Sequence, residues 1–275
     1  MIVDYHVHTP YCGHAHGQII QYIQTAIQKG ISEIGFSDHL GRYYLSKMQK
    51  RRYWDWGMGE RDLARYFKEL SDLKEVFANQ IKIKIGLEID YVEGAEEILM
   101  RIIDKYPLDF CIGSIHCLPR FSWEHLSEIK EIDTGLIYND YFRLVRAALQ
   151  CKIFNSIAHI DFIWRYIKWP PQGKEMVFNE IVDTIKTAAE YNTCVEINAN
   201  GYVWAKANQM HPNDPFDFFL EQIKLLNANI TIGSDAHEPF LVGKAFPAII
   251  ALLKDKGINT VSCFTDGKTS YEQLG

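Results

Sequence analysis

The stretch Ile2-Val3-Asp4-Tyr5-His6-Val7-His8 decides the fold. Its β-branched and aromatic residues predict a short buried strand. An amphipathic pattern over residues 18–29 follows, and a second strand pattern over residues 33–37 completes a strand-helix-strand unit. Such a unit places its two strands parallel, with the helix crossing over between them.

The same alternation continues along the chain. Strands are predicted over residues 2–8, 33–37, 81–89, 110–116, 156–159, 194–198 and 229–234. Helices are predicted over residues 18–29, 60–77, 95–105, 137–150, 174–191, 216–226 and 241–256, because apolar residues recur there at three- and four-residue steps. An open doubly wound sheet would accept this order too. Because no glycine-rich dinucleotide fingerprint is present, we favour an α/β barrel, which need not be regular.

Bulk properties narrow the class of protein. The 275 residues suit one large barrel or two smaller domains, and no repeat or linker divides them, so we expect one domain over residues 1–275. A net charge of −6 argues against a dedicated nucleic-acid surface. The cysteines form no C-x-x-C pair, the start resembles no signal peptide, and no run of about 18 apolar residues exists. We therefore expect a cytoplasmic protein with reduced thiols and no membrane span.

Histidines and carboxylates gather at the predicted ends of strands. His6 and His8 stand two residues apart and share one face of the first strand. In a parallel barrel the carboxyl ends of all strands meet at one mouth, where active sites form. We expect nine residues to surround one cavity there: His6, His8, His14, His39, Glu88, His116, His159, Asp235 and His237.

Imidazole and carboxylate together suit Zn, Mn or Fe. Nine ligands exceed the four to six or so that one ion takes, so two or three divalent ions are predicted. His16, His125 and His211 lie in loops or at helix starts, where ordinary surface roles are expected. Cys12 is expected to be a small packing residue. The segment over residues 42–58 is rich in tyrosine and tryptophan and is predicted to be a long loop. It could pack as an ordinary lid, or it could cover an imidazole or another flat ring of a ligand.

These motifs resemble the polymerase and histidinol phosphatase (PHP) family, from residue 4 to residue 243. The matching stretches are Asp4-Tyr5-His6-Val7-His8-Thr9 with Cys12-Gly13-His14, Ser37-Asp38-His39, Gly86-Leu87-Glu88, Gly113-Ser114-Ile115-His116, Ala158-His159-Ile160-Asp161 and Ser234-Asp235-Ala236-His237. The resemblance implies a distorted (βα)7 barrel with its metal site at the carboxyl ends of the strands. It also implies one ion held by His6, His8, Glu88 and Asp235, a second by Glu88, His116 and His159, and a third by His14, His39 and His237.

Within the family, the histidinol-phosphatase branch is the most similar, and it hydrolyses L-histidinol phosphate in histidine biosynthesis. The similarity lies in the Cys12-Gly13-His14 loop, in Glu196-Ile197-Asn198 with Gly201, and in Val242-Gly243 after the last motif. The chain departs from that branch at Leu40, at Tyr202-Val203-Trp204 and at His211-Pro212. These departures fall in loops expected to meet the substrate.

The expected reaction is hydrolysis of a phosphomonoester by a metal-bound hydroxide. Arg165 is the first candidate for the phosphate clamp, with Arg120, Asn198 and Lys206 as weaker substrate contacts. Asp38 and Asp161 stand beside expected ligands, and either could protonate the leaving group or orient a ligand histidine. Three alternatives stay open: a nuclease or pyrophosphatase-like activity, a phosphotyrosine phosphatase, and a metal-binding module without turnover.

Overall fold

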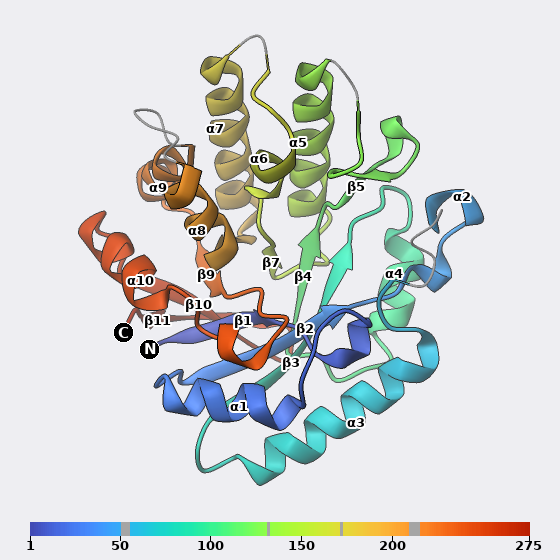
Figure 1. Ribbon diagram of the computed structural model, residues 1–275, viewed down its shortest axis with the longest axis vertical. Coiled ribbons are helices and arrows are strands. Elements are labelled where there is room, and N and C mark those ends of the chain that lie inside the picture. The colour runs from blue at the N-terminus through green and yellow to red at the C-terminus, as the bar shows by residue number, and fades with distance from the viewer. Residues whose placement is uncertain (51–55, 131–132, 171–172, 209–214) are drawn as a thin grey trace.

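The computed structural model describes residues 1–50, 56–130, 133–170, 173–208 and 215–275 (Figure 1). Seven parallel strands form the central sheet in the order β1-β2-β3-β4-β7-β8-β9. Their bounds are β1 Val3–Val7, β2 Glu33–His39, β3 Lys82–Asp90, β4 Phe110–Ser114, β7 Ser156–Ile157, β8 Cys194–Asn198 and β9 Ile230–Gly233. The spatial order of the strands follows the chain, as in a barrel of repeated βα units.

The first and last strands meet and almost close the barrel. Asp235 donates its backbone N–H to the carbonyl of His6 at 2.7 Å, and His8 donates to the carbonyl of Ala236 at 2.9 Å. Val7 and Ala236 form an isolated parallel bridge just beyond β9. The predicted distorted barrel is therefore confirmed, and the open doubly wound sheet is excluded.

The amphipathic stretches form helices around the sheet (Figure 1). They are α1 Ile19–Gln28, α3 Glu60–Val76, α4 Glu96–Ile103, α5 Thr134–Gln150, α7 Lys174–Tyr191, α9 Pro215–Leu226 and α10 Phe246–Asp255. α5 begins earlier than predicted, because Asp133 caps its first turn by accepting a hydrogen bond from Gly135 N at 3.0 Å. α10 begins later, because Gly243 and Ala245 have φ values of 63° and 59°, which an α-helix does not contain.

Several small elements lack a periodic pattern and were not predicted. They are α2 Lys47–Lys50, α6 Phe162–Tyr166, α8 Ala199–Asn208, the hairpin of β5 Cys117–Leu118 with β6 Glu124–His125, and the hairpin of β10 Thr260–Thr265 with β11 Lys268–Gln273. Residues 199–208 mix small and polar residues without an apolar stripe, so periodicity could not find α8. In the described part of the chain, none of the helices is long and apolar enough to cross a membrane.

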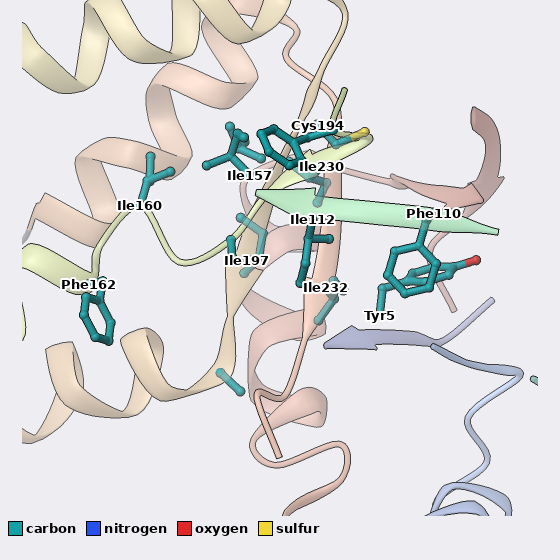
Figure 2. Close-up of a cluster of buried hydrophobic side chains, with 14 of the residues drawn as sticks. Tyr5, Phe110, Ile112, Ile157, Ile160, Phe162, Cys194, Ile197, Ile230 and Ile232 are labelled. Carbon is teal, nitrogen blue, oxygen red and sulfur yellow. The ribbon is translucent and has the colours of Figure 1, made fainter. Parts of the chain in front are cut away.

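Aromatic and branched apolar side chains on and around the strands form a buried core cluster, as Figure 2 shows. Phe110 packs edge-on against Tyr5 with ring centroids 5.1 Å apart, and Phe264 of β10 joins them, 4.9 Å from Tyr5. Gly35 and Gly86 leave room for this cluster, because a Cβ at Gly86 would come within 2.5 Å of the Phe110 ring. The β10–β11 hairpin thus contributes to the core of the barrel, with the site at the other end of the strands.

The strand predicted over residues 156–159 is shorter than expected. β7 ends at Ile157, because His159 has a φ of 23°, outside the range of a strand. Asp235, which follows β9, also has a positive φ, of 54°. Such conformations are strained for residues other than glycine, and they occur often at functional sites.

Candidate metal centre

The carboxyl ends of the strands bring the predicted residues together. Several sets of three have ligand atoms within 4.8 Å of one another: His6, His8 and Asp235; His6, Glu88 and His159; His8, His39 and Glu88; and His14, His39 and His237. Cys12 belongs to a further set with His8 and His237, so it is a possible soft ligand as well as the packing residue expected from the sequence. Eight of the nine predicted ligands occur in these sets. The ninth, His116, places Nε2 3.6 Å from Glu88 Oε1.

Glu88 lies at the centre of the cluster and is buried. Its two oxygens face different groups of imidazoles, which is the arrangement that a carboxylate shared between two ions requires. Oε2 lies 3.1 Å from His6 Nε2, 3.4 Å from His8 Nε2 and 3.1 Å from His39 Nδ1, and Oε1 lies 3.1 Å from His159 Nε2. Burial alone would raise the pKa of Glu88, but His39 and His6 hold it well below its ordinary value.

Most of the imidazoles are anchored through Nδ1, which leaves Nε2 for an ion. An oxygen that accepts the Nδ1 hydrogen fixes both the tautomer and the orientation of a ligand ring. The anchors are Glu196 Oε1 for His6 at 2.7 Å, the Cys12 carbonyl for His14 at 3.2 Å, Asp90 Oδ1 for His116 at 2.8 Å and the Asp235 carbonyl for His237 at 3.1 Å. His8 Nδ1 faces Asp38 Oδ1 at 3.4 Å, without a hydrogen bond among the described residues. This donor set fits divalent ions that prefer nitrogen and oxygen ligands.

Burial also keeps a peripheral imidazole neutral. It lowers the pKa of His237 to about 3, against a smaller opposing effect of Asp235. A neutral imidazole retains the lone pair that a metal ion needs, whereas an imidazolium does not.

Asp38 has its oxygens engaged in local structure. It is fully buried, accepts a hydrogen bond from Thr9 N at 3.1 Å and from the Thr9 hydroxyl, and faces His8 Nδ1. Of the two roles left open for Asp38, this geometry supports orientation of His8 over protonation of a leaving group.

Asp161 instead pairs with Arg165. Arg165 Nη2 donates to Asp161 Oδ2 at 3.2 Å and to Asn198 Oδ1 at 3.0 Å. Its Nε is buried and has no hydrogen-bond partner among the described residues. An orphaned buried N–H is rare and indicates a missing acceptor, so the geometry keeps Arg165 as a candidate substrate contact. Asn198 is fully buried, and its amide already bonds Arg165, Glu196 and the backbone N–H groups of Asn200 and Gly201, so the structure supports a role in holding Arg165 instead.

The two weaker candidate cations lie elsewhere. Arg120 is 59% exposed and approaches Asp140 of α5 at 3.6 Å. Lys206 is exposed on α8, with Nζ 5.6 Å from the ring centroid of Tyr202. Neither has a contact with the nine-residue cluster among the described interactions, so the structure supports the surface interpretation of both.

Glu196 on β8 is a functional residue that the sequence interpretation missed, although its motif was noted. One oxygen anchors His6, and the other accepts from His159 N at 2.7 Å and from Asn198 Nδ2 at 3.0 Å. Gly233 makes room for it, because a Cβ there would lie 2.0 Å from Glu196 Oε1. Its isolated position inside a strand carries no ligand spacing, so the motif was noted without a role for Glu196 itself.

Replacing Glu196 with glutamine is expected to weaken metal binding about 10-fold, because outer contacts of ligand histidines typically contribute that much or more. The amide can still accept one hydrogen bond, but it brings an NH₂ group against either His6 or the His159 N–H. Competition with a chromophoric chelator measures the affinity. Wild-type affinity in Glu196→Gln would show that His6 does not depend on this anchor.

The long segment after β2 contributes an aromatic wall. The Trp56 ring lies 4.8 Å from His39 and 5.1 Å from His116 between centroids. His125, expected to have an ordinary surface role, is partly buried beside Trp56 at 6.1 Å, and burial lowers its pKa to about 4. Its ordinary surface role stays a prediction, although the β5–β6 hairpin brings its ring to 6.1 Å from that of His116. Tyr53, Trp54 and His211 lie outside the described residues.

Comparison with known proteins places this site in a family. The sequence profile of the PHP domain matches residues 4–200. This chain belongs to the PHP domain family. The match covers six of the seven parallel strands and ends before Asp235 and His237, which complete the cluster from β9 onward.

Relatives within the PHP family match almost from end to end. A probable histidinol-phosphatase of Deinococcus radiodurans is 29% identical over 266 residues, covering 95% of this chain and 96% of the relative. The histidinol-phosphatase of Bacillus subtilis is 27% identical, covering 90% and 97%. The solved histidinol phosphate phosphatase of Lactococcus lactis, in complex with zinc, L-histidinol and phosphate, superposes with a TM-score of 0.81 at 23% identity, over 98% of both chains.

Proposed function

We propose that this PHP protein is a metal-dependent phosphatase that hydrolyses L-histidinol phosphate, the phosphatase step of histidine biosynthesis. The observation that carries the proposal is the cluster of nine histidines and carboxylates at the barrel mouth, with Glu88 shared between its two sides. The names of the full-length relatives from Deinococcus radiodurans and Bacillus subtilis support the substrate.

Two or three divalent ions would be held as the family resemblance implies. His6, His8, Glu88 and Asp235 would hold the first, Glu88, His116 and His159 the second, and His14, His39 and His237 the third. Zinc, manganese and iron all suit this donor set. When bound, such ions act as Lewis acids towards phosphoryl oxygens and activate water as the nucleophile.

The residues of the chain bind and orient the phosphate ester. The buried Nε of Arg165 offers a charged donor to a phosphate oxygen, while Asp161 and Asn198 hold the guanidinium in place. We assign Asp38 and Asp161 to positioning, Asp38 of His8 and Asp161 of Arg165. The ring of Phe162 packs 4.9 Å from His116, so this side of the cluster is shielded from water.

The organic part of the substrate has a pocket beside the cluster. A shallow, open pocket of about 460 Å³ is lined by Cys12, Gly13, His14, Trp56, His125, Ser127 and Glu128. Its aromatic rings could stack on an imidazole, and its carboxylate could attract an ammonium group. L-histidinol phosphate carries both groups.

Steady-state kinetics with metal-reconstituted protein test the proposal. With Zn, Mn or Fe added back, we expect kcat/KM for L-histidinol phosphate to exceed that for phosphotyrosine and glycerol phosphate by at least about 100-fold, since even one small group in a pocket changes kcat/KM by about 10- to 200-fold. A value no better than for these esters would contradict the substrate assignment. Cleavage of single-stranded DNA in preference to all three esters would favour a nuclease.

A further inference from the structure

Two largely buried arginine–aspartate pairs flank the metal centre, and each aspartate stands two residues after an expected ligand. Asp90 follows Glu88 and pairs with Arg42, while Asp161 follows His159 and pairs with Arg165. Arg42 is only 3% exposed. Because burial of an ion pair costs desolvation energy, a buried pair is weak evidence for stability alone. The function of each pair must therefore be inferred from the other groups that its arginine and aspartate contact.

The aspartate of the Arg42–Asp90 pair also bonds the imidazole of His116, an expected metal ligand. Arg42 donates to Asp90 Oδ2 from Nε at 3.1 Å and from Nη2 at 2.6 Å. The other oxygen, Oδ1, accepts from His116 Nδ1 at 2.8 Å and from His116 N at 3.3 Å. Asp90 thus uses one oxygen for the arginine and the other for the ligand. An aspartate held by two donors on one side cannot turn away from the imidazole on the other.

The Arg165 pair has a different design. Among the described residues, Asp161 has no hydrogen bond to a ligand imidazole, and the Arg165 Nε is left for an acceptor that the protein does not supply. Arg165 is therefore suited to binding the substrate. In contrast, the Nε and Nη2 groups of Arg42 both donate to Asp90. Arg42 also lies 5.2 Å from the ring centroid of Trp56, and the same Trp56 ring packs beside His39 and His116.

We propose that Arg42 is a positioning residue that holds Asp90 and, through it, the tautomer and ring orientation of His116, and so sets the affinity of one metal position. This inference rests on the proposed role of His116 as a metal ligand. The sequence pattern had placed Arg42 at the start of a loop, with no indication of a buried partner 48 positions away.

Metal binding, measured without any substrate, tests this role. Apoprotein prepared with a chelator is titrated with Zn²⁺ against a chromophoric competitor, and with Co²⁺ while its visible absorption bands are recorded. For Arg42→Gln we expect one class of site to weaken about 10-fold with altered Co²⁺ bands, and the remaining sites to keep wild-type affinity. Asp90→Asn should weaken the same class, and the double variant should be no worse than the more affected single variant, since both act through one contact chain.

Matched variants separate positioning from loss of folding. Arg143→Gln removes a surface arginine, 46% exposed, that pairs with Glu93, and it should bind both metals as the wild type does. Arg42→Lys keeps the charge but not the two donors to one oxygen, so its affinity should be intermediate. If Arg42→Gln does not fold, Arg42→Lys and Asp90→Asn decide the question. Wild-type affinity and Co²⁺ bands in the folded Arg42 variants would overturn the proposal, whichever ester the enzyme hydrolyses.

Discussion

Replacing Glu88 with glutamine is expected to lower kcat/KM for L-histidinol phosphate by about 1,000-fold, because several kcal/mol of charge stabilisation are lost with a shared ligand. Both Glu88 oxygens face imidazole nitrogens, so the amide NH₂ of glutamine must point at one group of histidines. We also expect metal content to fall by at least one ion per chain, measured by plasma mass spectrometry.

The matched control for Glu88 is an exposed glutamate. Glu93 is 58% exposed and pairs only with surface groups among the described contacts, so Glu93→Gln should keep wild-type kinetics and metal content. Near-wild-type turnover and full metal content in Glu88→Gln would show that Glu88 does not bridge ions.

Replacing Arg165 with methionine is expected to lower kcat/KM about 100-fold with metal content unchanged, because a hydrogen bond to a charged group contributes about 1.5–3 kcal/mol. The variant leaves Asp161, 2% exposed, without its partner, which alone could destabilise the fold. The double variant Arg165→Met, Asp161→Asn removes that unpaired charge and isolates the effect on the substrate.

Urea unfolding and metal analysis accompany the kinetics of both Arg165 variants. A 100-fold loss that persists in the stable double variant would support the phosphate clamp. Wild-type kcat/KM in the double variant would remove Arg165 from the substrate site. Arg120→Met serves as the surface control, since Arg120 is 59% exposed and contacts Asp140.

The fold and the cluster of candidate metal ligands follow from local patterns. Strands of β-branched residues end in histidine or carboxylate, and the parallel geometry of a barrel gathers those ends at one mouth. The two-residue spacing of His6 and His8 places both rings on one face. These features need only short stretches of sequence, which explains why the barrel and the ligand cluster could be predicted without the structure.

The groups that hold the ligands depend on contacts between distant residues. Glu196 anchors His6 across 190 positions, and Arg42 meets Asp90 across 48. A buried arginine and a surface arginine look the same in a local pattern, so Arg42 and Arg120 could not be separated from the sequence. The β10–β11 hairpin was missed for a related reason. The role of Phe264 in the core depends on its contact with the ring of Tyr5, which is distant in the sequence.

Anomalous diffraction from crystals of zinc-loaded protein, recorded at the zinc absorption edge, tests the metal centre most directly. We expect two or three peaks within the cluster, at least one of them within coordinating distance of Glu88 and of His6 or His159. Zinc bound only at surface sites, with no peak among these side chains, would contradict the assignment of this cluster as the catalytic metal centre.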